Sequence, residues 1–167
     1  MPSFAKHFEE KCFVSASMES LFRYLDDPAR LNSHMTTGSW RMGGSQMSVR
    51  ADEYHGQKIG SKTRLAGRIL GFNLYVTTCV TERNPPIRKV WETLEKPHLL
   101  VIDQYRMGMD LSPNENGCLL RIFIDYQLPS SPAARLLAWV LGDWYARWCV
   151  RQMLSDAARA FVAGQAK

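Results

Sequence analysis

The sequence predicts an α+β fold in which a curved antiparallel sheet of six or seven strands wraps a long C-terminal helix. Three observations predict it. Apolar residues alternate with polar ones in several segments between residues 4 and 128, and short turns separate most of them. Two short helical segments follow the first of these strands. After Pro132 the chain has no further proline and keeps the apolar spacing of one helix face to about residue 163.

The first strand and the two short helices come from the first thirty residues. Residues 4–14 alternate with a period of two, which is typical of a half-buried strand. Ser17 is one of several hydroxyl residues that can cap a helix, and apolar residues at helical spacing then predict a helix over 18–25. Asp27 followed by Pro28 predicts the start of a second helix, because an acid caps the first turn and proline fits the first helical position.

Alternating segments separated by turn residues predict the rest of the sheet. Glycine and small polar residues in 36–46 predict a loop before it. Gly71, the prolines after Asn84 and the polar run 112–117 are the turn signals between strands. The predicted strands are 62–70, 72–80, 87–94, 99–111 and 120–128. Connections of hairpin length between consecutive strands favour an antiparallel meander.

Length and composition favour one globular domain over residues 1–167. Hydrophobic residues make up 46% and charged residues 22%, which excludes wholesale disorder. The four cysteines form no C-x-x-C pair, which argues against a zinc site and a disulfide framework and favours free thiols in a reducing compartment. Neither a signal peptide nor an apolar run long enough to span a bilayer is evident. We therefore expect a cytoplasmic protein.

The basic charge of the chain does not by itself indicate nucleic-acid binding. The formal net charge is +5, but no run of Lys and Arg exceeds two residues. Surfaces that bind nucleic acid usually cluster their cations, so a solvated basic surface is the simpler interpretation and we expect no nucleic-acid partner. The four histidines fall in different predicted elements and form no metal-binding spacing. We expect neither a metal nor a cofactor.

The predicted arrangement implies a cavity. A helix about 10–12 Å across does not fill the concave side of a curled sheet of this width. Large side chains either plug the gap, which would be plain core packing, or leave a pocket for a guest. Methionines adapt to irregular apolar guests and tyrosines add polar tips. The candidate ligand-binding residues are Leu74, Val76, Tyr105, Met107, Met109, Ile122, Ile124 and Tyr126 from the sheet, with Trp139, Val140 and Asp143 from the helix.

Several segments resemble one known superfamily. Residues 13–28 resemble the first strand and helix pair of the START-like superfamily, also called SRPBCC or Bet v 1-like. Residues 124–129, with 141–149 and Met153, are similar to the last strand and closing helix of its bacterial polyketide cyclase/dehydratase branch. The resemblance covers nearly the whole chain and implies a helix-grip fold. It implies a hydrophobic ligand such as a lipid, a quinone or a polyketide, and it fixes no activity.

The second hypothesis is that the protein is an enzyme. Members of that branch fold reactive chains with pocket arginines, tyrosines and acids. By alternation Arg106, Arg121 and Asp125 face away from the apolar side of the sheet, so we interpret them as surface groups. Candidate catalytic groups of a cyclase, aromatase or dehydratase are Tyr105, Tyr126 and Asp103, the last as an inward carboxylate near a strand end.

The first half of the long helix is apolar nearly all round, which requires burial on more than one side. The residues that add the extra apolar face are Leu137, Leu141, Trp144, Tyr145 and Trp148. Cover by the end of the sheet and the 36–46 loop is the plain interpretation. A homodimer contact, a peripheral membrane contact through Trp144 and Trp148, and a mobile cavity mouth are the alternatives. Asp143 either pairs with Arg147 or anchors a polar group of the ligand.

Overall fold

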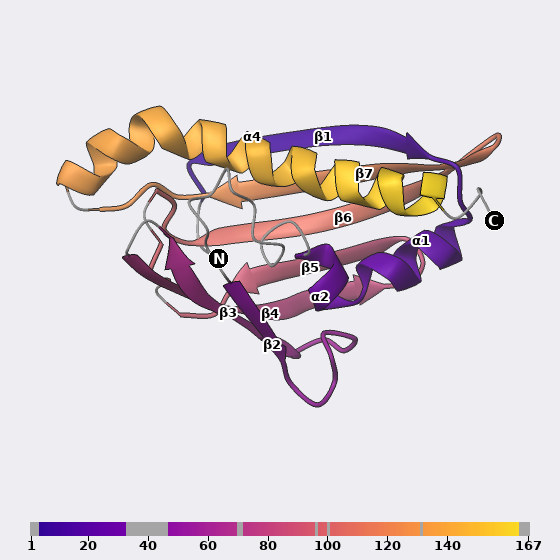
Figure 1. Cartoon of the computed structure of the whole chain (residues 1–167), viewed down its shortest axis with the longest axis horizontal. Helices are drawn as coiled ribbons and strands as arrows, with labels where there is room; N and C mark the ends of the chain where they lie inside the picture. The colour runs from indigo at the N-terminus through magenta and orange to yellow at the C-terminus, as the bar shows by residue number, and fades with distance from the viewer. Residues whose placement is uncertain are drawn as a thin grey trace.

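The computed structural model describes residues 4–32, 47–69, 72–95, 97–99, 101–130 and 132–163. Over these residues the chain forms a seven-stranded antiparallel sheet in the order β1-β7-β6-β5-β4-β3-β2, with helices on its concave face (Figure 1). The strands are β1 (Lys6–Val14), β2 (Met47–Ala51), β3 (Lys62–Ile69), β4 (Phe72–Asn84), β5 (Arg88–Thr93), β6 (Tyr105–Asn114) and β7 (Gly117–Tyr126). The helices are α1 (Met18–Leu25), α2 (Pro28–Leu31) and α4 (Pro132–Ala163). The predicted α+β helix-grip architecture is confirmed.

The short helices begin where their capping residues predict. The Ser17 side chain accepts a hydrogen bond from the Ser20 backbone N–H at 3.2 Å, and α1 follows at Met18. The Asp27 carboxylate accepts from the Ala29 N–H at 2.9 Å, with Pro28 in the first turn of α2. These side chains satisfy N–H groups that a helix start leaves without a partner.

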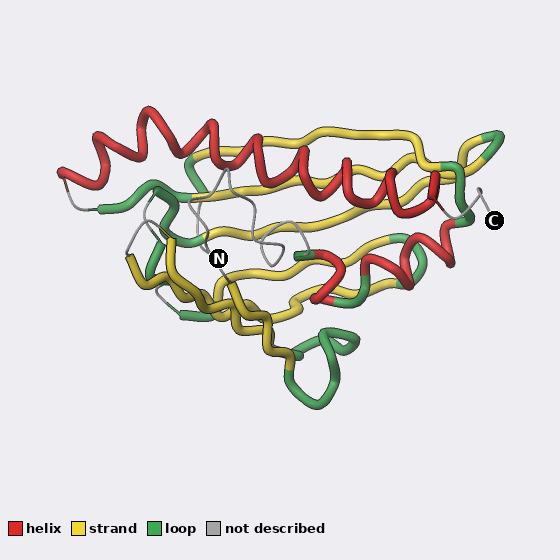
Figure 2. The backbone as a smooth tube through the Cα atoms, in the orientation of Figure 1, coloured by secondary structure: helices red, strands yellow, loops and turns green. Residues whose placement is uncertain are grey.

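Helix α4 runs along one side of the sheet and packs mainly against β1 and β7. From Ala146 onward it buries a stripe that includes Val150 and Ala157, whereas its first turns extend past the ends of those strands (Figures 1 and 2). A Cβ atom at Gly142 would lie 3.2 Å from the Val101 carbonyl, so glycine permits the close approach of α4 to the 101–104 segment. Among the described residues, no helix combines the length and hydropathy needed to cross a membrane.

The outer face of the sheet carries the residues predicted to be surface groups. Phe123 lies opposite Gly108, and its ring occupies the place that a Cβ at Gly108 would take. The guanidinium groups of Arg88, Arg106 and Arg121 lie 5.5, 5.9 and 5.0 Å from the centre of that ring. Acidic groups of the neighbouring strands pair with these arginines. This face is a network of charges around one buried aromatic ring, remote from the concave side.

The strand predicted over 99–111 begins later than expected. Leu94 and His98 still pair with β4 through backbone hydrogen bonds, and the Asp103 N–H already donates to the Gln127 carbonyl at 2.9 Å. Residues 99–104 therefore cross from the β4 side to the end of β7 before β6 starts at Tyr105. β2 was not predicted, because five residues are too few to show a clear alternation. The loop predicted over 36–46 lies outside the described residues.

A buried ion pair joins the end of α1 to the sheet. Lys89 of β5 and Asp26, the residue that caps the C-terminus of α1, are 2% and 4% exposed. The Lys89 ammonium donates to the Asp26 carboxylate at 2.7 Å and to its backbone carbonyl at 2.8 Å. Arg83 of β4 donates to both carboxylate oxygens, at 3.3 and 2.8 Å. Burial acts to raise the pKa of Asp26, but the hydrogen bonds from Arg83 and Lys89 outweigh it and hold that pKa below its ordinary value.

Replacing Asp26 by asparagine should destabilise the fold strongly. The change leaves the buried Lys89 without its counter-charge, so we expect the free energy of unfolding to fall by about 3–5 kcal/mol in urea titrations. The matched control is Asp27→Asn at the adjacent exposed cap, where asparagine caps as well and the loss should stay below about 1 kcal/mol. Equal losses in the two variants would contradict the assigned role of the ion pair.

The same pair predicts an acid-sensitive component of stability. Because the pKa of Asp26 is lower in the folded state than in the unfolded chain, its contribution is complete above the unfolded pKa of about 4. That contribution is lost as the pH falls through the lower folded pKa. In urea titrations between about pH 6 and pH 3, wild type should therefore lose more stability than Asp26→Asn. Parallel curves would show that Asp26 does not carry this component.

Candidate functional site

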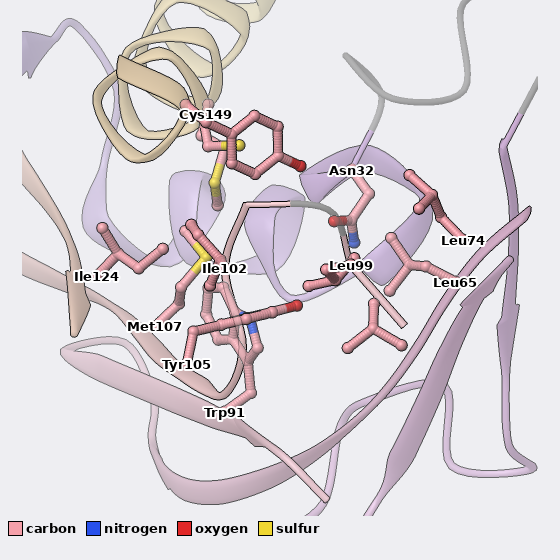
Figure 3. Close-up of a pocket in the computed structure, with 13 residues that line it drawn as sticks. Asn32, Leu65, Leu74, Trp91, Leu99, Ile102, Tyr105, Met107, Ile124 and Cys149 are labelled. Carbon is pink, nitrogen blue, oxygen red and sulfur yellow. The ribbon is translucent and has the colours of Figure 1, made fainter. Parts of the chain in front are cut away.

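A cavity of about 60 Å³ lies between the concave face of the sheet and the helices (Figure 3). Most of its wall is apolar, with a few polar tips. The sheet contributes Leu65, Leu74, Val76, Trp91, Tyr105, Met107 and Ile124, the 97–104 connection contributes Leu99 and Ile102, and Asn32, Tyr145, Cys149 and Met153 come from the end of α2 and from α4. A concave apolar space with few polar groups is the usual form of a small-molecule site.

The size of the cavity shows what it can hold as it stands. One water needs roughly 10–15 Å³ of such space, so the cavity exceeds the need of a single water. Pockets for drug-sized ligands measure roughly 300–1,000 Å³. A second space of about 20 Å³ shares Asn32, Leu65, Trp91 and Tyr105 with the first and reaches Lys89. Movement of the shared side chains would join the two spaces, so a guest larger than a few waters has to widen the site.

Three hydroxyl and thiol groups on the wall stay protonated at neutral pH. Burial raises the pKa of the Tyr105 phenol above its ordinary value and that of Tyr145 well above it. Burial raises the pKa of the Cys149 thiol to about 12, although a hydrogen bond with Tyr145 opposes the change. These three groups therefore present neutral donors and acceptors to the site.

Two polar groups lie close to the space where a guest would sit. The Asn32 amide nitrogen donates to the Pro28 carbonyl at 2.8 Å, which fixes the side chain at the end of α2 and leaves its oxygen as an acceptor. The Tyr105 hydroxyl has no hydrogen-bond partner among the described residues, and Figure 3 shows it directed into the same space as the Asn32 side chain. A guest hydroxyl could donate to the Asn32 oxygen and accept from Tyr105, whereas a carbonyl oxygen could only accept from Tyr105.

The structure brings five of the predicted site residues together and leaves three elsewhere in the core. Those that line the cavity are Leu74, Val76, Tyr105, Met107 and Ile124. Met109, Ile122 and Tyr126 share the inner face of the sheet but are buried in the main core and do not line the cavity. The alternation placed all eight on the concave face, but it does not tell which part of that face the helix covers.

Two of the predicted helix residues, Trp139 and Asp143, do not line the cavity. Trp139 is 69% exposed and lies in a groove with Leu128 and Arg135. Asp143 accepts hydrogen bonds from Lys6 and from the Tyr126 hydroxyl, both at 2.6 Å, and these lower its pKa. It is therefore engaged with β1 and β7. The side chain of Val140 lies outside those that the structure describes.

The α4 residues that do line the cavity were not among the predicted site residues. Tyr145, Cys149 and Met153 recur every four residues on α4, which is a recognisable pattern of one helix face. Of the helix residues chosen from the sequence, Asp143 contacts β1 and β7 and Trp139 is exposed, whereas the stripe of Tyr145, Cys149 and Met153 faces the cavity between α4 and β3–β6. Asp103 does not line the cavity, and its backbone N–H donates to Gln127. Among the described residues, no group of three His, Cys, Asp or Glu side chains could hold a metal ion.

Comparisons with known proteins identify the fold. No family model matches the sequence, and no curated protein matches it. Protein TTHA0849 from Thermus thermophilus aligns over 95% of this chain and 99% of its own, with a TM-score of 0.69 and 14% identity. Ara h 8.0201 aligns over 95% and 98%, with a TM-score of 0.63 and 10% identity. Ginseng major latex-like protein 151 from Panax ginseng aligns over 92% and 97%, with a TM-score of 0.56 and 13% identity. The chain thus has the Bet v 1-like helix-grip fold that these structures share.

Proposed function

We propose that the protein binds a hydrophobic small molecule of the lipid, quinone or polyketide-like class between the sheet and α4. The observation that carries this proposal is the cavity itself, which is lined by apolar side chains while the Tyr105 hydroxyl and the Asn32 amide oxygen remain available. A guest with an apolar body and an oxygen that accepts from Tyr105 complements the site, and a hydroxyl on the guest would also donate to the Asn32 oxygen. Carriage of the molecule, or its presentation to another enzyme, is the function that such a site serves.

The wall of the cavity is suited to widening around a guest. Met107 comes from β6 and Met153 from α4, so a methionine lies on the sheet side and another on the helix side. An unbranched thioether side chain changes rotamer at low cost and fits irregular shapes. A guest that displaces these side chains exchanges their contacts for its own. Expansion of a small empty cavity is therefore compatible with the packed core around it.

The chemistry of the wall favours binding over catalysis. No carboxylate or imidazole is among the described lining residues, and Tyr105, Tyr145 and Cys149 are held in their neutral forms. General acid–base catalysis works best with groups whose pKa values lie near the working pH. A cyclase, aromatase or dehydratase at this site would depend on the shape of the cavity and on the phenols alone.

Filling the cavity should abolish binding. In Val76→Phe the larger ring would occupy the space in the middle of the site, and we expect the affinity for the neutral fluorophore N-phenylnaphthylamine to fall at least about tenfold. Thr77→Phe is the matched control, since it lies next along β4 with its side chain on the outer face and should keep wild-type affinity. Unchanged binding in Val76→Phe, or equal losses in both variants, would refute the proposed site.

Removing the free hydroxyl should change the preference between guests. The rings α-tetralone and tetralin share one skeleton, and only the ketone carries an oxygen that can accept from Tyr105. In competition with the fluorophore, Tyr105→Phe should weaken α-tetralone about three- to tenfold and leave tetralin nearly unchanged. Loss of affinity for both compounds alike would show that Tyr105 shapes the cavity without recognising an oxygen.

A further inference from the structure

The start of α4 exposes a cluster of large apolar side chains that we call the α4 patch: Leu136, Trp139, Leu141 and Trp144. Their exposed fractions are 72%, 69%, 40% and 62%. The patch lies on the turns of α4 that extend past the ends of β1 and β7 (Figures 1 and 2). So large a cluster on one helix end is more than the scattered apolar residues that soluble surfaces normally show.

The patch takes up more than half of the helix circumference instead of following one face, while Ala138 on the remaining side is fully buried. Leu136 and Trp139 precede Leu154 and Ala157 by five full helical turns, so each pair shares one angular position. Leu154 and Ala157 are buried against the sheet, whereas Leu136 and Trp139 have no strand beneath them. Leu141 lies toward the opposite side of the same turns, and Trp144 lies between it and Leu136. A helix end that is apolar on both sides needs a surrounding that accepts it from several directions, as the interfacial layer of a bilayer does.

The charges around the patch favour an anionic surface. Between residues 132 and 155, α4 carries Arg135, Arg147 and Arg151 and a single acid, Asp143. Arg151 pairs with Glu10 of β1 at 2.8 Å, so Arg135 and Arg147 supply the positive charge near the patch. Asp143 is paired with Lys6 at 2.6 Å, so it adds no net negative charge beside the patch. Arg135 is exposed in the same groove as Leu136 and Trp139. Cations next to interfacial tryptophans are attracted to anionic headgroups, and the net charge of +5 acts in the same direction.

Three aromatic rings in mutual contact connect the patch to the cavity wall. The rings of Trp144 and Trp148 stack with centroids 6.5 Å apart, and those of Tyr145 and Trp148 stack at 6.0 Å. Tyr145 is part of the cavity wall. An apolar path therefore leads along α4 from the exposed tryptophan to the site. Either a bilayer or a second copy of the chain could cover the patch. We choose the bilayer on the basis of the proposed function, because a membrane holds the hydrophobic molecules that the cavity would bind.

We propose that the first turns of α4 dock into the interfacial layer of a lipid bilayer, with anionic lipids strengthening the contact. Trp139 and Trp144 enter the headgroup region, and Arg135 meets the lipid phosphates. The helix lies in the interface and does not cross the membrane, which agrees with its hydropathy. Burial of two tryptophans supplies the apolar part of the binding free energy.

Vesicle co-sedimentation of the full-length protein tests the proposal. We expect binding to vesicles of phosphatidylcholine with phosphatidylglycerol, weaker binding to phosphatidylcholine alone, and weakening by salt. The double variant Trp139→Ser/Trp144→Ser should reduce partitioning at least about tenfold. The matched control is Ile59→Ser/Val162→Ser, which removes two side chains that are 66% and 71% exposed elsewhere and should change partitioning less than about twofold.

Two further outcomes would overturn the docking proposal. The first is that the wild type does not bind vesicles. A wild type that binds no vesicles but forms a dimer, which the Trp139→Ser/Trp144→Ser substitutions dissociate, would identify the patch as a contact between two copies of the chain. The second is an equal loss of binding in the control variant. Lipids brominated near the headgroup should quench tryptophan fluorescence in the wild type, and an unquenched spectrum would contradict insertion of Trp139 and Trp144.

Fluorophore binding without vesicles separates this proposal from the proposed function. The Trp139→Ser/Trp144→Ser variant should keep wild-type affinity for N-phenylnaphthylamine, because neither tryptophan lines the cavity. The Val76→Phe variant should keep vesicle binding, because Val76 is buried on β4. Vesicle binding in a protein that binds no apolar fluorophore would leave the docking surface standing and remove the proposed ligand site.

Discussion

The mismatch in width between one helix and a seven-stranded sheet governs the rest of this structure. Helix α4 packs mainly against β1 and β7 at one side of the sheet. Among the described residues, α1 and α2 lie over the concave side of the other strands (Figure 1), and Leu99 and Ile102 from the chain between β5 and β6 line the cavity there. Small elements joined by loops fill such a space less completely than a second long helix would. The cavity lies where these covers meet α4, and its wall includes Asn32 from the end of α2, Leu99 from the connection and Cys149 from α4.

The small helices hold their place through polar contacts as well as apolar packing. Lys89 and Arg83 bind the carboxylate of Asp26 in the interior, which fixes the joint between α1 and α2 over β4 and β5. Desolvation makes a buried ion pair a weak source of net stability, and its main effect is to penalise other placements of the helices. The Asn32 side chain, bonded to Pro28, ends this unit at the cavity wall. The ion pair thus determines where one polar group of the candidate site lies.

Local pattern predicted the elements well, and tertiary placement limited the prediction of the site. Pro132 and the long apolar periodicity fix the bounds of α4, and alternation correctly placed Val76 and Ile124 on the concave face. Which stripe of α4 faces the cavity depends on the lateral position of the helix, and no local pattern carries that information. The stripe that includes Asp143 was therefore chosen instead of the one that includes Cys149. The pairing of Asp26 with Lys89, 63 positions apart, could not be predicted from the sequence for the same reason.

The cavity and the exposed start of α4 are two consequences of the same geometry. A helix of 32 residues is roughly 48 Å long, whereas β1 and β7 have nine and ten residues and span roughly 30–34 Å. Once its C-terminal half is packed over these strands, its first turns have to extend beyond them. Ala138 of these turns is fully buried, whereas burial of Leu136 and Trp139 would need either a longer sheet or an external surface. A helix shorter by three turns would close the same cavity, so the extra length points to a contact made outside the fold.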